Sequence, residues 1–250
     1  MKNNNQFFAM LSRMKYINRW GLMRNTMKED IAQHSLEVAM IAHALVLIHN
    51  QHFCGMPSDL DQIRDKFDFE QSEVGQEEND FSFRQSEDNQ KEEASSLEQS
   101  QGKQDKKQLG KLSAERAAVL AMYHDTTEII TGDLPTPIKY FAPQIRDSYK
   151  KVEEMAANQL LQTLPKELQL DYQSILLAQE DESELWGFVK AADKLSAYIK
   201  CLEETRVGNV DFEKAKQSTK KALDDMNIAE VNYFIKKFLP AYSLTLDEQA

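Results

Sequence analysis

Cysteine, glycine and proline are all scarce in this sequence, and their scarcity narrows the fold class. The 250 residues contain two cysteines, Cys54 and Cys201, far apart and not in CxxC spacing. That argues against a disulfide framework or a thiolate zinc site. The 8 Gly and 6 Pro are too few for a turn-rich all-β fold, whereas abundant Leu, Ala, Glu, Lys and Met favour helix. We therefore expect an all-α protein.

Positive charge is also in short supply. Against 41 acidic residues stand 30 Lys and Arg, a net charge of −11, which disfavours a nucleic acid polymer or an anionic membrane as partner. A small anionic substrate stays compatible, because a metal ion can supply positive charge locally. No apolar run approaches the roughly 20 residues that span a bilayer. The start of the chain also lacks the pattern of a signal peptide, so the expected compartment is the cytoplasm.

One segment, residues 56–110, has almost no apolar periodicity. It holds 15 acidic and 7 basic residues, a balance of −8, so it carries most of the net charge. Such a segment buries too little apolar surface to offset the entropy of ordering. We predict a disordered acidic insertion at 56–110, flanked by a single helical domain formed by residues 1–55 and 111–250.

The rest of the chain has helical periodicity. One short amphipathic helix is predicted within 7–17, and an irregular loop at 131–137. The longer predicted helices cover residues 31–48, 114–125, 149–164, 185–204, 211–226 and 228–239.

Two places combine polar side chains with apolar surroundings. His124 and Asp125 close a very apolar helix, although such a pair taken alone is usually just a polar helix end. Asp193 lies in the middle of an apolar helix, where a buried carboxylate is unfavourable unless a cation or hydrogen-bond donors compensate. A nearby Lys or Arg would serve that purpose as well as a metal.

The positions of the histidines in their helices narrow the choice of candidate ligands. His34 stands one turn into its helix, whereas His43 is nine residues further and falls on the opposite face. We interpret His43, His49 and His52 as structural or solvated. Together, His34, His124, Asp125 and Asp193 form a mixed nitrogen and oxygen set that suits a divalent transition ion or Mg²⁺ better than a structural zinc.

The order His34, His124-Asp125, Asp193 resembles the HD-domain superfamily of metal-dependent phosphohydrolases. Surrounding motifs are similar to those of the bacterial YfbR-type 5′-deoxynucleotidases. They are Phe7-Phe8-Ala9 through Asn18-Arg19-Trp20, Leu22-Met23-Arg24-Asn25, Ala121 to Asp125, Gly132 to Pro137, Lys200 to Glu204 and Leu244 to Glu248. The resemblance spans residues 6 to 248. It implies a helical HD-domain bundle, commonly a homodimer.

The resemblance also implies roles for single residues. His34, His124, Asp125 and Asp193 would hold a divalent ion such as Co²⁺, Mn²⁺ or Mg²⁺, and the two aspartates would also border the substrate. Arg19 would clamp the 5′-phosphate, since a guanidinium can make two parallel hydrogen bonds to phosphate.

Further roles concern the sugar and the water. Trp20 would pack on the sugar and select deoxyribose, and Glu128, three residues after Asp125, would orient or deprotonate the attacking water. Asp133 would assist the leaving oxygen. The pocket for the nucleoside would be lined by Asp133, Leu134, Pro135 and Thr136.

One position departs from the family pattern. The residue before the first ligand histidine is typically Glu, and here it is Gln33. A neutral amide orients an imidazole less strongly than a carboxylate does, so we expect weaker support for His34.

The implied reaction is hydrolysis of a deoxyribonucleoside 5′-monophosphate to deoxynucleoside and phosphate. Two alternatives remain open. One is another HD-domain chemistry, namely a dNTP triphosphohydrolase or a cyclic-nucleotide phosphodiesterase. The other is a non-catalytic nucleotide-binding protein.

Overall fold

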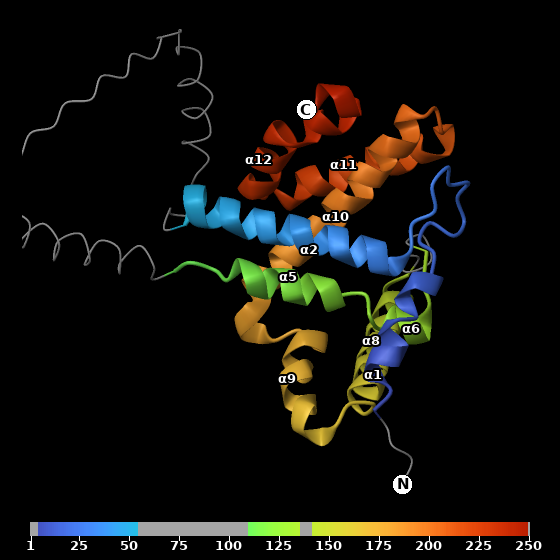
Figure 1. Cartoon of the computed structure of the whole chain (residues 1–250), viewed down its shortest axis with the longest axis vertical. Helices are drawn as coiled ribbons and strands as arrows, with labels where there is room; N and C mark the ends of the chain where they lie inside the picture. Colours follow the sequence, from blue (N-terminus) through green and yellow to red (C-terminus); the bar gives the residue numbers. More distant parts are fainter. Residues whose placement is uncertain (1–4, 55–109, 136–141, 250) are drawn as a thin grey trace, which may run out of the picture. The chain divides into compact units, whose positions relative to one another are not determined.

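The computed structural model describes residues 5–54, 110–135 and 142–249, and these are helical, with no strand among them (Figure 1). The all-α prediction is confirmed. The chain divides into two compact units, one formed by Met1–His49 with Leu112–Ala250 and the other by Asn50–Lys111. The predicted disordered insertion at 56–110 lies, except for Gly110, outside the described residues. The fold below is that of the first unit.

Helix α2 (Ile31–Ile48) is the central element and has the predicted bounds. The carboxylate of Asp30 caps its first turn by accepting hydrogen bonds from the backbone N–H groups of Ala32 and Gln33. Its buried face, which includes Val38, Ala42 and Leu45, packs on helices α5 (Ala114–Tyr123) and α10 (Ser183–Arg206). Figure 1 shows α5 running beside α2, with α10 crossing behind them.

The helix from Ile31 through a π-helical turn, His49–Phe53, is long and apolar enough to span a bilayer by length and composition. This corrects the expectation that no apolar run approaches that length. More than half of its apolar stretch, 56%, is buried inside the protein. Its apolar residues therefore serve largely as the core of the helical unit.

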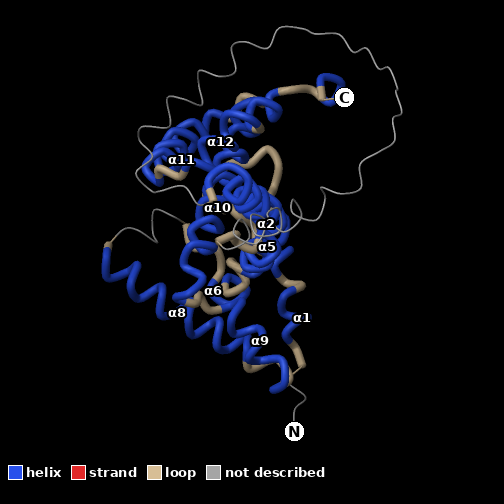
Figure 2. The backbone as a smooth tube through the Cα atoms, turned by 90° about the vertical axis from the view of Figure 1, so that its left-hand side faces the viewer, coloured by secondary structure: helices blue, strands red, loops and turns tan. Residues whose placement is uncertain are grey.

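Helices α2, α5 and α10 lie in the middle of the unit, and two groups of helices flank them (Figure 2). On one side lie α1 (Phe7–Leu11), α6 (Glu128–Thr131), α8 (Pro143–Leu161) and α9 (Lys166–Leu176). On the other lie α11 (Glu213–Met226) and α12 (Ala229–Lys237). Short 3-10 turns occupy Met14–Tyr16, Glu180–Glu182, Val210–Phe212, Leu239–Ser243 and Leu246–Glu248.

Several predicted boundaries need correction. The single helix expected within 7–17 is two pieces, α1 and the Met14–Tyr16 turn. Helix α8 begins at Pro143 and not at 149, because proline is well suited to the first helical position. Helix α9 was not predicted at all; none of its residues is buried, so its apolar stripe is weak in the sequence. Helix α5 ends at Tyr123, two residues before its predicted end.

Candidate active site

The early end of α5 matters for chemistry, because it releases His124 and Asp125 from helical geometry. Both residues lie in the turns between α5 and α6. On a continuing helix they would point about 100° apart. Here His124 Nε2 and Asp125 Oδ2 are 3.1 Å apart.

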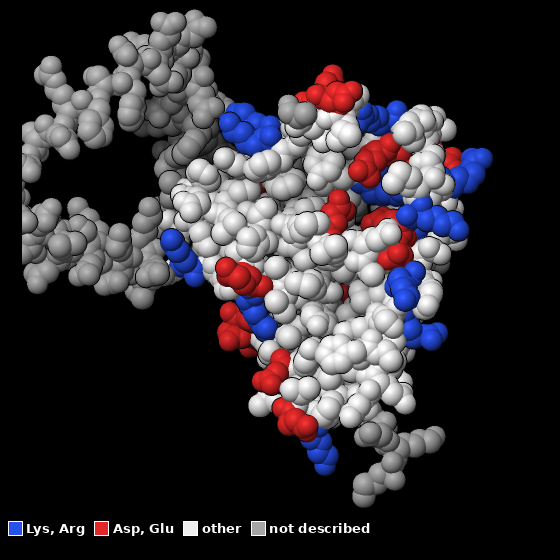
Figure 3. Space-filling view, viewed as in Figure 1, with Lys and Arg blue, Asp and Glu red and all other residues white. Residues whose placement is uncertain are grey.

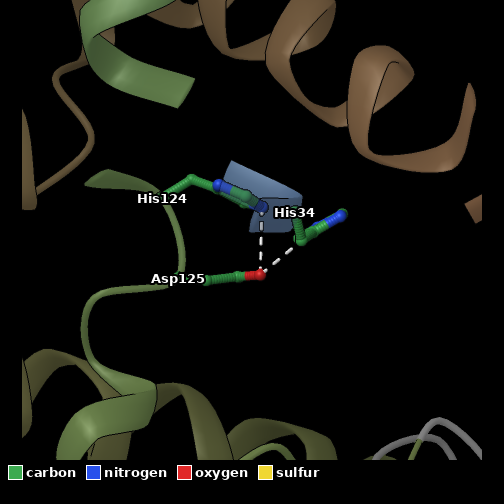
Figure 4. Close-up of side chains that lie close together, drawn as sticks. All are labelled: His34, His124 and Asp125. Carbon is green, nitrogen blue, oxygen red and sulfur yellow. Dashed lines mark ion pairs between the residues drawn. The ribbon is translucent and has the colours of Figure 1, made fainter. Parts of the chain in front are cut away.

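Helices α2 and α10 and the turn after α5 bring all four predicted ligands together. His34 on α2 points its Nε2 at Asp193 Oδ1 on α10, 3.1 Å away, and at Asp125 Oδ2, 3.5 Å away. Figure 4 shows His34, His124 and Asp125 converging on one space. Donor atoms of these three residues all lie within 4.8 Å of one another.

His124 presents the clearest sign of a cation site. Its Nδ1 donates to the carbonyl of Ala121 at 2.7 Å, so the lone pair of the neutral ring is on Nε2. That Nε2 is buried and makes no hydrogen bond within the described part of the chain. Burial lowers the pKa of His124, but the carboxylates of Asp125 and Asp193 outweigh it and raise the pKa to about 9. The two carboxylates thus favour a positive charge at this point, which a divalent cation can supply.

His34 is oriented from its other nitrogen. Its Nδ1 lies 3.0 Å from Ser196 Oγ, and that hydroxyl donates to Glu37 Oε2 at 2.5 Å. In the tautomer that carries its proton on Nδ1, the ring donates to this hydroxyl and leaves Nε2 for an ion. Gln33, by contrast, is exposed. The weaker support expected from Gln33 stays a prediction; in the structure Ser196 and Glu37 orient the ring from α10 and α2.

Arg19 competes for the same nitrogen. Its Nη1 lies 2.7 Å from His34 Nδ1, and because a guanidinium can only donate, this contact needs the tautomer with the proton on Nε2. A cation on Nε2 requires the opposite tautomer. The Arg19 contact and cation binding at His34 therefore exclude one another, so a bound cation leaves this guanidinium available to another acceptor.

Arg19 and Trp20 belong to a loop that starts and ends side by side. Asn18 and Asp30 form an isolated antiparallel bridge, and the Arg19 N–H donates to the Glu29 carbonyl at 2.9 Å. Trp20 has a φ of 57°, a left-handed conformation that is strained for a bulky side chain by roughly 1–3 kcal/mol and that clusters at functional sites.

Glu29 joins these two residues. Its Oε1 accepts from Arg19 Nη1 at 3.0 Å, and its Oε2 accepts from Trp20 Nε1 at 3.0 Å. Burial alone would raise its pKa, but hydrogen bonding and charge from His34 and Arg19 lower it. Glu29 is thus an ionised buried carboxylate that fixes a guanidinium and an indole beside the ligand cluster.

A second carboxylate, Glu204 on α10, anchors the far part of the loop. It accepts from the backbone N–H and the hydroxyl of Thr26, from Asn209, and from Lys200 Nζ at 2.6 Å. Lys200 also donates to the carbonyl of Met27 at 2.6 Å. Burial opposes ionisation of Glu204, but these donors lower its pKa. The Lys200–Glu204 motif therefore holds the loop.

Glu128 begins α6 and is buried; its N–H donates to the Asp125 carbonyl at 3.0 Å, so the two residues lie one turn apart. Gly132, with φ 72°, ends α6 and turns the chain toward the partly buried Asp133. Leu134 and Pro135 follow, also partly buried, while Thr136 lies outside the described residues.

Sequence comparison identifies the family of this chain. The profile of the family described as 5′-deoxynucleotidase YfbR-like matches residues 6–74 and 93–242. The chain belongs to the YfbR-like 5′-deoxynucleotidase family. The stretch left unmatched, 75–92, falls inside the segment 56–110.

Relatives of this YfbR-like chain match it over nearly its full length. A 5′-deoxynucleotidase of Photorhabdus laumondii is 40% identical over 242 residues, which is 97% of this chain and 95% of the relative. The same values hold for 5′-deoxynucleotidases of Photorhabdus temperata and Yersinia pestis. A crystal structure of an HD-domain phosphohydrolase from Listeria innocua matches 98% of this chain and 91% of its own with a TM-score of 0.63. At 18% identity that likeness shows the fold.

Sequence reasoning missed the residues that hold the predicted ones in place. Glu29, Ser196 and Glu37 had no visible signal, because their partners are distant in the chain. Lys200 and Glu204 had one, since their motif was part of the family resemblance. Their i, i+4 spacing on one helix predicts only an ion pair, and the tertiary fold adds the loop to it.

Proposed function

We propose that this YfbR-like enzyme hydrolyses deoxyribonucleoside 5′-monophosphates to the deoxynucleoside and phosphate. The observation that carries the proposal is the buried Nε2 of His124, directed with His34, Asp125 and Asp193 at one space beside Arg19. The printed names of the 5′-deoxynucleotidase relatives support the substrate class.

His34, His124, Asp125 and Asp193 fit a divalent cation, because two imidazole nitrogens and two carboxylates suit Co²⁺, Mn²⁺ or Mg²⁺. When bound, such an ion supplies Lewis-acid charge and lowers the pKa of a coordinated water. Asp125 supports this role, since its pKa is lowered: burial raises it, and the charge of His124 outweighs the burial. The pKa of Asp193 is lowered as well: burial raises it, and the hydrogen bond and charge of His34, with the charge of Arg19, outweigh the burial. Both aspartates are therefore ionised and can hold a cation.

The other residues bind substrate and move protons. Arg19, whose Nη2 lies 3.6 Å from Asp193 Oδ1, clamps the 5′-phosphate next to the ligand cluster. Trp20 packs on the sugar and disfavours a 2′-hydroxyl. Glu128 orients or deprotonates the attacking water. Asp133 protonates or stabilises the leaving 5′-oxygen.

Residues Asp133 to Thr136 line the nucleoside pocket in this proposal, and Asp125 and Asp193 border the phosphate. The enzyme acts in the cytoplasm, which its two free thiols, Cys54 and Cys201, support because thiols persist in reducing compartments. It acts as a homodimer and binds no nucleic acid polymer or membrane; the net charge of −11 supports the latter two statements.

The test is phosphate release from a substrate panel after EDTA treatment and reloading with Co²⁺, Mn²⁺ or Mg²⁺. We expect release from dAMP and other deoxymonophosphates with at least one ion, and little from AMP. Faster release of triphosphate from dATP, or of AMP from a cyclic nucleotide, would assign the enzyme to another HD-domain chemistry. Nucleotide binding without any turnover would make the protein a non-catalytic binder.

A further inference from the structure

Glu29 is a buried acid whose two carboxylate oxygens are bound by two different side chains of the site. Its Oε1 accepts from Arg19 Nη1 and its Oε2 accepts from Trp20 Nε1, both at 3.0 Å. The residue is 9% exposed, so water cannot easily replace either bond. One acid therefore fixes the guanidinium and the indole at the same time.

The indole of Trp20 is held from its ring face as well. The ring of Phe212, a fully buried residue, lies 5.3 Å from it between centroids. Trp20 has a φ of 57°, a strained conformation that persists only where surrounding contacts hold it. Phe212 packs against the ring but has no acceptor for the indole N–H. The direction of the indole therefore depends on its hydrogen bond to Glu29.

Arg19 keeps donors for a ligand while it is bound to Glu29. A guanidinium has five N–H donors, and the bond to Glu29 uses one of them, on Nη1. Nη2 lies 3.6 Å from Asp193 Oδ1, and the Arg19 side chain is only 14% exposed. The guanidinium is thus directed at the ligand cluster, and a phosphate bound there lies where Glu29 places the guanidinium.

Other charged side chains near this loop lie at the surface. Figure 3 shows acidic and basic side chains mixed on the side of the molecule where the 18–30 loop lies, to the right of α2 in Figure 1. Arg24, whose side chain is 89% exposed, pairs with Asp211 at 2.8 Å. Exposed pairs of this kind contribute little to stability. Glu29 differs because it acts in the interior, and the Arg24–Asp211 pair offers a control for it.

We propose that Glu29 is the positioning residue that sets the separation of the phosphate site and the sugar site, an inference that rests on the proposed function. In a nucleoside 5′-monophosphate, the covalent structure limits the span from the phosphate to C2′. The enzyme can match that span only if Arg19 and Trp20 keep a fixed separation, and the two oxygens of Glu29 provide it. A 2′-hydroxyl then meets the indole whenever Arg19 holds the phosphate.

The variant Glu29→Gln breaks this arrangement. An amide has one acceptor oxygen and a donor NH₂, so it can accept from Arg19 or from Trp20 but not from both. We expect the preference for dAMP over AMP in kcat/KM to fall about tenfold, which is the order of one lost hydrogen bond to a charged group. The KM for dAMP should rise. Bound metal is measured alongside, at saturating ion, because Glu29 Oε1 also lies 3.4 Å from His34 Nδ1.

The matched control is Asp211→Asn. It makes the same change from carboxylate to amide, at an acid that accepts from Arg24 on the outer part of the loop. We expect this variant to keep the preference and the KM of the wild type. Thermal unfolding checks that both variants fold. If Glu29→Gln does not, Glu29→Asp replaces it, because aspartate keeps the charge but is one methylene too short to reach both donors.

A double-mutant cycle shows whether the effect acts through the indole. Trp20→Phe keeps an aromatic ring but removes the N–H that Glu29 accepts. In the Trp20→Phe background, Glu29→Gln should lower the preference no further. A general loss of stability would act in both backgrounds alike, so this comparison distinguishes positioning from a structural role.

The outcomes separate this inference from the proposed function. A wild type that is inactive on every monophosphate defeats the proposed function itself. An active wild type that lacks the preference, or one whose preference survives in Glu29→Gln, defeats only the inference. An equal fall in both backgrounds, or a fall that accompanies loss of bound metal, shows that Glu29 does not act through Trp20 and also overturns the inference.

Discussion

The ligand cluster and the 18–30 loop lie against each other but are built differently. His34 and Asp193 come from long helices whose apolar faces form the core, so their positions follow from packing. Arg19 and Trp20 sit on a loop with a left-handed Trp20, which Glu29 and Glu204 secure by hydrogen bonds. The comparison teaches that the cation should depend on the helices, whereas the choice of substrate should depend on the loop.

The largest expected effect comes from removing a ligand. Asp193→Asn or His124→Ala should abolish turnover and lower the bound metal, because each removes an anionic charge or an orphan nitrogen from the cluster. Metal analysis of the purified variants, together with phosphate release from dAMP, gives the measurement. His52→Ala, a histidine outside the cluster, should match the wild type in both. Full activity after exhaustive EDTA treatment would contradict the metal site.

The next largest effect is expected from removing Glu204, which anchors the 18–30 loop. Glu204→Ala leaves the ammonium of Lys200 and the Thr26 N–H without their buried acceptor, so we expect about 3 kcal/mol lower stability. The KM for dAMP should rise while metal content stays unchanged, since no cluster residue moves. Thermal unfolding, metal analysis and steady-state kinetics measure the three quantities. Loss of metal together with the loop would show that the two regions are not independent.

Sugar selection sharpens the comparison further. Trp20→Ala should narrow the gap between dAMP and AMP, with bound metal intact, because only the loop side of the site changes. Rates on both nucleotides at matched metal loading measure it. If the wild type cleaves both equally fast, Trp20 has no role in sugar selection.

The smallest effect is on pH dependence. The pKa of Glu204 is lowered from its ordinary 4.5 by the donors around it, so its stabilising contribution is present above pH 4.5. It is lost as the pH falls toward the lower folded pKa, because the unfolded state then binds the proton more readily. Glu204→Gln should therefore show a shallower loss of stability between pH 5 and 3, measured by urea unfolding. If the free energy of unfolding falls with pH as steeply in Glu204→Gln as in the wild type, Glu204 is not ionised in the folded protein.

Much of the helical layout could be predicted from the sequence. The bounds of α2 followed from its period and from Asp30 as a cap, since both are local properties. Helix α9 could not be predicted in this way, because it buries no residue and its apolar pattern is weak. Three of the four ligand candidates could be named because an aspartate inside an apolar helix and a His-Asp pair at a helix end are unusual in themselves. His34 joined them through its place one turn into its helix and through the order of residues that resembles the HD-domain superfamily.

By itself, the sequence determined the helical class, the central helix and the residue types that a cation needs. Only the tertiary structure decided that α5 stops at Tyr123, which lets His124 and Asp125 turn toward one space. It also decided that Glu29 joins Arg19 to Trp20 and that Ser196 orients His34 from α10. Period and capping are read from neighbours in the chain, whereas these contacts join residues up to 162 positions apart, and packing alone brings them together.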